Sequence, residues 1–242
     1  MQIVLVRHGQ STNNHLYETS VRVEDIGAPT ERRWHRGRVP DPPLTDLGVR
    51  QAEALGAALC VGRAPFAPTH LYASLTARAV QTARPLAEAT GLPVVLRADA
   101  YEVGGIHYYD PDARVRRARP GATLRDLQRH CPAAVPEPGI FGDPDAPWDG
   151  GLEQDDACAL PRARGLLDSL RAAHGPDDVA VVVSHQYFSQ FVIAALFGFG
   201  GPPWRRFRVD NTAHLAILVD GGRTSVEWVN RCDHLDPADM TN

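Results

Sequence analysis

The chain has 242 residues, of which 43% are hydrophobic, a size and composition compatible with one large α/β domain or two small ones, without disulfides. Its formal net charge of −4 argues against general binding to nucleic acids or membrane surfaces. The four cysteines have no Cys-x-x-Cys spacing, which argues against a zinc site and a disulfide framework, and no apolar run approaches the ~20 residues that span a bilayer. We therefore expect a cytoplasmic protein.

The first predicted element is a strand that ends at a basic pair. Residues 3–6 form a short β-branched run, typical of a strand buried on both faces, and Gly9 ends it. The pKa of a free imidazole is about 6.5, so His8 could act as an unprotonated nucleophile. Arg7 keeps its charge, and its planar guanidinium fits two oxygens of a phosphate. On its own, however, this tripeptide more often marks a hydrogen-bonded histidine at a strand end.

The elements that follow alternate between helix and strand. Residues 13–43 are polar and rich in arginine and proline, which predicts a long loop with one helical turn at most. Thr45 is a good helix N-cap, and Gly91 is a typical helix terminator. The patterns predict a helix from 45 to about 61, a strand over 70–73, a helix over about 77–90 and a strand over 94–96.

The composition changes between residues 103 and 150, where proline, glycine, aspartate and arginine dominate around one predicted helix over 124–130. Its sparse apolar residues are too few for a separate core, so we expect a single domain over residues 1–242 with a lid or insertion at about 103–150. The remaining elements are predicted as a helix over about 153–174, a strand over 179–183, a helix over 187–197 and a hairpin of strands 214–219 and 224–229.

This alternation predicts an α/β fold, a three-layer sandwich whose mostly parallel central sheet has helices on both faces. Ligands of such sheets bind beyond the carboxyl ends of the strands. Four segments lie at predicted carboxyl ends, and we expect them to converge on one pocket: Arg7 and His8, residues 74–78, Glu102, and His185.

These segments resemble the histidine phosphatase superfamily, the group that includes cofactor-dependent phosphoglycerate mutase. Arg7 to Ser11 with Asn14 resembles the signature Arg-His-Gly-Glu/Gln-Ser/Thr-x-x-Asn. A second block runs from Asp41 to Ala52, and a third, Ser-x-x-x-Arg-x-x-Gln-Thr-Ala, runs from Ser74 to Ala83. Val183-Ser184-His185 is similar to the second histidine motif of the family.

The resemblance implies a phosphoglycerate mutase-like fold and a phosphohistidine intermediate on His8, with no metal and no organic cofactor. It implies that Arg7, Arg78 and His185 hold the phosphoryl oxygens and that Glu102 is the proton donor. By the same analogy Asn14 contacts the phosphate or the substrate. Glu88, Asp99 and Glu153 are alternatives to Glu102, which geometry must decide.

Two departures from the family pattern bear on the reaction. Gln186 follows His185 where glycine is usual, and Val-Gly-Gly-Ile-His follows Glu102 instead of the Arg-His-Tyr-Gly of true mutases. We therefore expect a metal-independent phosphatase, a phosphoric monoester hydrolase, for a small phosphorylated metabolite. The alternatives are phosphoglycerate mutase-type transfer and a catalytically idle protein that binds a phosphorylated ligand.

Other features have two interpretations each. The arginines of residues 32–38 and 114–119 either steer an anionic substrate or form a solvated face. His107, Tyr108 and Tyr109 either line the pocket or pack in the ordinary way. The sequence is compatible with a homo-oligomer and does not fix the substrate.

Overall fold

The computed structural model describes residues 1–20, 34–199 and 207–242. Within them, seven strands form the main sheet, in the spatial order β6-β3-β2-β7-β1-β8-β9. Their bounds are Gln2–Arg7 (β1), His70–Ser74 (β2), Val94–Arg97 (β3), Ala134–Pro136 (β6), Val179–Ser184 (β7), His214–Asp220 (β8) and Arg223–Arg231 (β9).

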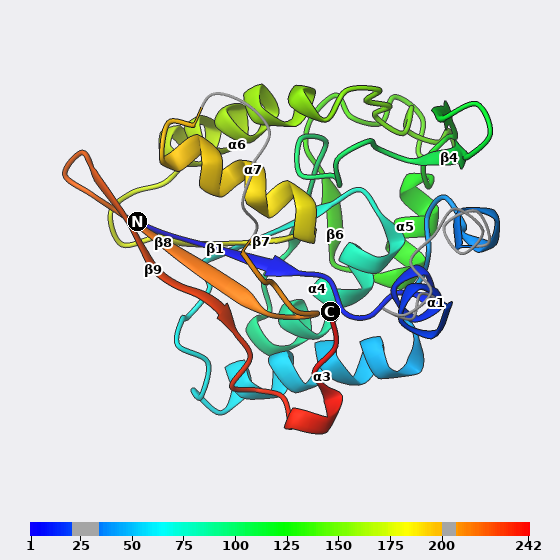
Figure 1. Ribbon diagram of the computed structural model, residues 1–242. Helices are drawn as coiled ribbons and strands as arrows, with labels where there is room; N and C mark the ends of the chain where they lie inside the picture. Colours follow the sequence, from blue (N-terminus) through cyan, green and yellow to red (C-terminus); the bar gives the residue numbers. More distant parts are fainter. Residues whose placement is uncertain (21–33, 200–206) are drawn as a thin grey trace.

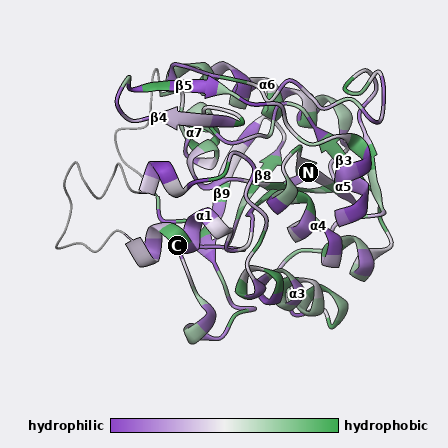
Figure 2. Cartoon of the chain, turned by 90° about the vertical axis from the view of Figure 1, so that its right-hand side faces the viewer, coloured by the Kyte–Doolittle hydropathy of each residue, from purple (hydrophilic) through white to green (hydrophobic). Residues whose placement is uncertain are grey.

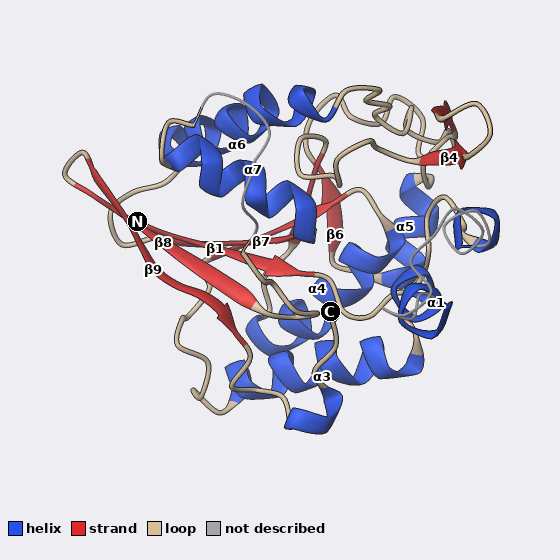
Figure 3. Cartoon of the chain, in the orientation of Figure 1, coloured by secondary structure: helices blue, strands red, loops and turns tan. Residues whose placement is uncertain are grey.

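Helices cover both faces of this sheet. In Figure 1, α6 and α7 lie on one side of it and α3 and α4 on the other, and Figure 3 shows the same three layers by secondary structure. The bounds are Thr12–Ser20 (α1), Asp46–Cys60 (α3), Ala77–Thr90 (α4), Leu124–His130 (α5), Ala159–Ala173 (α6) and Gln186–Leu196 (α7), with short 3-10 turns at Asp156–Cys158 and Pro237–Asp239.

The sheet is mostly parallel, as predicted. β1, β7, β2, β3 and β6 run parallel to one another, whereas β8 is antiparallel to β1 and β9 is antiparallel to β8. The expected three-layer α/β sandwich is therefore confirmed. The carboxyl ends of β1, β2 and β7 lie at one edge, next to α1 and the end of the chain in Figure 1.

Alternating side chains of the buried strands build two cores. In β1, Val4 and Val6 pack toward α3 and α4, whereas Ile3 and Leu5 pack toward α6 and α7. All four are at most 2% exposed, as expected of strands covered on both faces. Figure 2 shows hydrophobic and hydrophilic residues mixed along α3, in keeping with a helix that has one face on the sheet.

Most predicted boundaries are confirmed to within a few residues. The Thr45 side chain accepts a hydrogen bond from the N–H of Gly48, which starts α3. Gly91 ends α4 in the left-handed region, with φ of 71°. The predicted helix 124–130 is present as α5, and the predicted hairpin near the end of the chain is β8 and β9.

Two predicted boundaries are wrong. The helix expected from 153 begins only at Ala159, because the Glu153 carboxylate turns back to the N–H of Gly104 and to Arg162 instead of capping a helix. The loop expected over 13–43 begins with the nine-residue helix α1, in which no residue is buried, so it lacks the apolar periodicity that would predict it. Residues 21–33 of that loop lie outside the described residues.

The segment 103–150 has two parts. Strands β4 (His107–Asp110) and β5 (Val115–Ala118) form a separate antiparallel hairpin. Further along, β6 pairs with β3 at the edge of the main sheet, which the sequence did not reveal. Leu127 of α5 packs into the core beside α4. The second part therefore extends the central layers, and the hairpin is the piece that stands over the carboxyl edge.

Candidate active site

His8 lies at the carboxyl end of β1 and is 5% exposed. Its Nδ1 is 2.7 Å from the carbonyl oxygen of Gly9, which can only accept, so we assign the proton to Nδ1 and the lone pair to Nε2. The pKa of His8 is well below its ordinary value, first because burial desolvates the ring and then because Arg78 and Arg7 are close. The ring is therefore a neutral imidazole with a free Nε2.

The loop that carries His8 is fixed by residues of the second and third sequence blocks. A Cβ on Gly9 would lie 2.5 Å from the carbonyl oxygen of Gly48, so only glycine allows this loop to touch the first turn of α3. The N–H of Gly9 donates to Thr82 Oγ1 at 3.0 Å, and the N–H of Gln10 donates to Gln51 Oε1 at 2.8 Å. These block residues position His8, and neither Thr82 nor Gln51 lines the cavity that opens above it.

Arg7 is buried beneath the loop. Its Nη1 donates to the carbonyl oxygen of Val209 at 2.7 Å and to Asn242 Oδ1 at 3.1 Å. Burial lowers the pKa of Arg7 to about 10, with Glu102 and Asp210 opposing that shift, so the guanidinium remains charged at neutral pH. Arg7 therefore presents a fixed positive charge beside His8.

Arg78 comes from the first turn of α4. Its Nη1 is 3.4 Å from Asp41 Oδ1, and its Nη2 donates to His185 Nδ1 at 3.2 Å. Asp41 also accepts from the N–H of Ala77, so one carboxylate holds both the start of the helix and its arginine. Burial lowers the pKa of Arg78, and Asp41 and Glu102 oppose this.

His185 follows β7 and is fully buried. Because Arg78 Nη2 can only donate to its Nδ1, the proton is on Nε2, which lies 2.9 Å from Ser74 Oγ. The ring centroids of His185 and His8 are 5.2 Å apart. Burial, followed by Arg78 and His8, holds the pKa of His185 well below its ordinary value. His185 is neutral here and contacts Arg78 and His8, but it does not line the cavity beside them.

Glu102 lies on the loop that follows β3. Its Oε1 accepts from the N–H groups of Val103 and Phe188, at 2.9 and 2.8 Å, and its Oε2 accepts from the N–H of Tyr187 at 3.2 Å. The carboxylate therefore caps the start of α7 while it borders the cavity.

The three alternatives to Glu102 point elsewhere. Asp99 pairs with Arg97, Glu153 with Arg162, and Glu88 with Arg84. None of the three acids lines the cavity. The geometry favours Glu102 over each of them.

A cavity of about 790 Å³ opens above His8. Asn14 lines it, and because Asn14 Oδ1 accepts from the N–H and Oγ of Ser11, its Nδ2 is the group that could donate to a ligand. The predicted residues Arg7, His8, Asn14, Arg78 and Glu102 all border this one cavity.

Sequence reasoning missed several residues of the same cavity wall. They are Tyr17 and Glu18 of α1, Trp34, Gln186, and residues 240–242. The last of them, Asn242, accepts from both Arg7 and Gln186 through Oδ1. Only Gln186 had a sequence signal, as the unusual residue after His185.

Glu18 and Arg38 add charge of both signs. Glu18 accepts from Gln10 Nε2 at 2.7 Å, and partial desolvation raises its pKa above the ordinary value. Arg38 lies over the ring of Trp34, 4.6 Å from its centroid, and its Nε has no hydrogen-bond partner among the described residues. Burial, followed by the charge of Arg78, lowers the pKa of Arg38 to about 10.

The structure distinguishes between the two interpretations of His107 and of the two arginine runs. His107 lines the cavity, and burial lowers its pKa to about 4. Arg36 pairs with Asp112 on the surface, Arg116 with Asp156, and Arg117 with Asp110. Arg32 and Arg33 lie outside the described residues. Arg38 is thus the arginine of these two runs that lines the cavity, as far as the described residues show.

Metal-ligating side chains do not cluster at this cavity within the described parts of the chain. Among the described residues, His70, His174 and Asp178 are close enough together to hold a metal ion, and they lie at the opposite end of the sheet from this cavity. Among the described helices, none has both the length and the apolar composition to cross a membrane.

Comparisons with known proteins add an independent finding. The profile of the histidine phosphatase superfamily (branch 1) matches residues 3–231. No curated protein sequence matches the chain significantly.

Solved structures of 18–20% sequence identity share the fold. A phosphoserine phosphatase of Entamoeba histolytica, in complex with 3-phosphoglyceric acid, is 18% identical over 96% of this chain and 98% of its own, with a TM-score of 0.58. A mycobacterial glucosyl-3-phosphoglycerate phosphatase is 20% identical over 95% and 98%, with a TM-score of 0.55.

Proposed function

The chain belongs to the histidine phosphatase superfamily (branch 1), and on that premise we propose that it is a metal-independent phosphatase. It hydrolyses a small phosphorylated metabolite through a phosphohistidine on His8. The observation that carries the proposal is the neutral His8, whose Nε2 is free beside the guanidinium groups of Arg7 and Arg78.

In the first step, His8 Nε2 attacks phosphorus, the N–P bond forms and the ester P–O bond breaks. Arg7 and Arg78 hold the negative oxygens of the phosphoryl group throughout, in a site where desolvation strengthens the attraction. A phosphoryl oxygen competes with Asn242 Oδ1 for the Nη1 of Arg7 and with His185 Nδ1 for the Nη2 of Arg78. When Arg78 turns from His185 to the phosphoryl group, His185 can take up a proton and donate from Nδ1.

The leaving oxygen needs a proton, which we assign to Glu102. A water molecule then attacks phosphorus, gives its proton to the carboxylate, and the N–P bond breaks to release phosphate. General acid catalysis of this kind contributes about 10²- to 10⁴-fold. Glu18 is the competing donor, because it borders the same cavity and its raised pKa favours the protonated form.

Arg38 supports a narrower substrate class, a phosphomonoester that carries a second anionic group. Its charge faces the cavity from Trp34, with its Nε unpartnered among the described residues, while Arg7 and Arg78 suffice for the phosphoryl oxygens. The structural relatives named above act on or bind phosphorylated carboxylic acids, which fits the same chemistry.

The activity can be tested with an aryl phosphate and a panel of phosphorylated metabolites in the presence of a chelator. We expect phosphate release, and an acid-labile phosphoenzyme that is absent from His8→Ala. Undiminished activity of His8→Ala contradicts the proposal. Primer-dependent isomerisation of 3-phosphoglycerate far above the rate of hydrolysis would replace it with mutase-type transfer, and binding of phosphate without turnover on any substrate would indicate an idle binding protein.

The proton donor is tested by comparing Glu102→Gln with Glu18→Gln. Aryl oxygens leave without much help, whereas alkyl oxygens need the proton, so loss of the donor should reduce alkyl phosphate hydrolysis by about 10²-fold or more and aryl phosphate hydrolysis much less. We expect this pattern for Glu102→Gln. The same pattern in Glu18→Gln alone would transfer the role to Glu18.

Arg38→Gln tests the second anionic group. The KM for phosphorylated carboxylic acids should rise roughly tenfold or more, in line with the loss of one charged hydrogen bond, while the KM for a neutral aryl phosphate should change little. Equal changes for both substrates would show that Arg38 has no part in selecting the acid group.

We also propose that the protein acts in the cytoplasm. The support is chemical: its four cysteines are free thiols, and Cys60 and Cys158 are exposed, which suits a reducing compartment. Recovery of the native protein mainly from a secreted or periplasmic fraction would contradict this location.

A further inference from the structure

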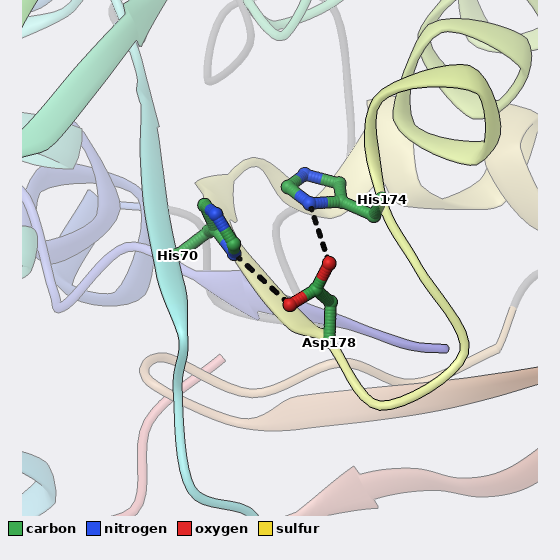
Figure 4. A group of neighbouring side chains, drawn as sticks. All are labelled: His70, His174 and Asp178. Atoms are coloured by element: carbon green, nitrogen blue, oxygen red, sulfur yellow. Dashed lines mark ion pairs between the residues drawn. The ribbon is translucent and has the colours of Figure 1, made fainter.

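A second histidine cluster lies at the amino end of the sheet, away from the phosphatase cavity. His70 is the first residue of β2, His174 follows the last residue of α6, and Asp178 directly precedes β7. Figure 4 shows the three side chains pointing toward one another, with dashed lines that mark ion pairs from the carboxylate of Asp178 to each ring. None of them contributes to the cavity above His8.

The distances are close to those of a metal site. His174 Nδ1 is 3.5 Å from Asp178 Oδ2, and His70 Nδ1 is 3.9 Å from Asp178 Oδ1. One ligand atom from each residue lies within 4.8 Å of the others. Zinc bonds of about 2.0–2.1 Å in a tetrahedral arrangement place ligand atoms roughly 3.4 Å apart, so small side-chain rotations would bring all three onto one ion.

The His174 ring is oriented for this role. Its side chain is 2% exposed, and its Nε2 lies 2.9 Å from the Tyr72 hydroxyl. Its Nδ1 is buried, faces Asp178, and has no hydrogen-bond partner among the described residues. If His174 Nε2 donates to the Tyr72 hydroxyl, Nδ1 carries no proton and its lone pair faces Asp178 Oδ2. These two groups repel each other, and a cation bound between them would attract both. A ligating imidazole whose other nitrogen binds a neighbouring oxygen is the usual arrangement in metal sites.

Asp178 is already held in place. The N–H of Gly175 donates to its Oδ2 at 2.8 Å, and Thr69 Oγ1 lies 3.4 Å from its Oδ1. The same hydroxyl lies 2.9 Å from His70 Nδ1, so a bound ion would displace that hydrogen bond. The side chains of His70 and Asp178 are 44% and 30% exposed, which gives an ion access from solvent.

We propose that His70, His174 and Asp178 form a binding site for a divalent transition-metal ion of the zinc class. Two imidazoles and one carboxylate suit Zn²⁺, whereas Mg²⁺ and Ca²⁺ prefer sites made of oxygen ligands. Water would complete the coordination. The ion would join the start of β2, the end of α6 and the start of β7, so its role is stabilisation of the fold and not phosphoryl transfer.

Titration of the chelator-treated full chain with Zn²⁺ by calorimetry tests the site. We expect one strong equivalent, a rise in Tm with Zn²⁺, and intense visible absorption with Co²⁺, as tetrahedral coordination gives. His70→Asn should weaken Zn²⁺ binding by at least about tenfold, the scale found even for residues that only support metal ligands. His15→Asn, which removes an exposed histidine elsewhere, is the matched control and should bind as the unmodified chain does.

Lack of Zn²⁺ binding by the unmodified chain, or equal binding by His70→Asn, overturns the site. Asp178→Asn provides a second variant, since its amide oxygen can still accept from Gly175 while the charge is lost. Circular dichroism of both variants without metal verifies that they fold. Phosphatase activity in chelator reports on the His8 cavity alone, so failure of the metal site and failure of the proposed function give different results.

Discussion

The two ends of the central sheet use histidine in opposite electrostatic surroundings. At the carboxyl end, His8 and His185 lie among the guanidinium groups of Arg7 and Arg78. Positive charge and burial keep both rings neutral, and the same positive charge attracts a phosphoryl dianion. Here we propose that the free lone pair of the His8 imidazole is the nucleophile.

At the amino end, the imidazoles of His70 and His174 face the carboxylate of Asp178. The nearby charge is negative, so the lone pairs are suited to a cation. Strand β2 begins at His70 and ends at Ser74, the hydroxyl that orients His185. If both proposals hold, the neighbouring charge, and not the histidine itself, decides between attack on phosphorus and metal binding.

The largest expected effect separates the two ends. His8→Ala removes the nucleophile and should reduce kcat/KM for an aryl phosphate by at least ~10⁴-fold, as loss of a nucleophile does in other covalent enzymes. Steady-state kinetics in chelator measures it. Zn²⁺ binding should be unchanged in this variant, and a matching loss of Zn²⁺ binding would show that the two ends are not independent.

Arg78→Ala tests the positive charge at the carboxyl end. It removes one donor to the phosphoryl oxygens and the partner of His185 Nδ1, and we expect a loss of about 10²- to 10³-fold in kcat. Arg78→Lys keeps the charge but loses the planar guanidinium that contacts both Asp41 and His185. Its kcat should therefore lie between that of Arg78→Ala and that of the unmodified chain. Full activity of Arg78→Lys would show that charge alone suffices.

Acid lability is the next effect in size, because several buried or partly buried histidines have lowered pKa values. They include His8 and His185, whose pKa values lie well below the ordinary value, and His107, His214 and His234, whose pKa values are about 4, 3 and 4, respectively. In each case burial is the first cause. The unfolded chain therefore binds more protons, so stability is fully present above about pH 6.5 and is lost as pH falls toward 4.

His214→Gln measures the contribution of one such histidine. Glutamine does not titrate and can still accept from Trp228 Nε1, which donates to His214 Nδ1 at 2.9 Å. The slope of the free energy of unfolding against pH should fall by about 1.4 kcal/mol per pH unit between about pH 6 and pH 4. Urea denaturation at several pH values checks this, and an unchanged slope would mean that His214 is protonated in the folded chain.

The smallest expected effect is that of His70→Asn on catalysis. His70 is exposed and does not line the cavity, so kcat/KM should stay within about twofold of that of the unmodified chain, the usual range for a surface change. The Tm rise with Zn²⁺ should disappear in the same variant. A large loss of phosphatase activity in His70→Asn without metal would show that the two ends of the sheet are coupled through β2 and do not act independently.

The order of the elements and the positions of the first candidate site residues can be predicted from the sequence alone. The buried β-branched runs predict β1 and β7, and Arg7, His8 and His185 come directly after them, so their place at the carboxyl edge follows from strand polarity alone. Local signals also fixed Thr45 as a helix cap and Gly91 as a helix end. Strand ends and helix caps are set by residues that are close together in the chain, so a sequence pattern predicts them.

Which distant residues lie together depends on the tertiary structure. Glu18 and Arg38 lie in segments with little periodicity, and Asn242 reaches Arg7 across almost the whole chain. His70 and Asp178 meet because β2 and β7 are paired in parallel, with His70 opposite Ala180, two residues after Asp178. Such contacts are set by sheet order and helix packing, which bring together residues that share no local pattern.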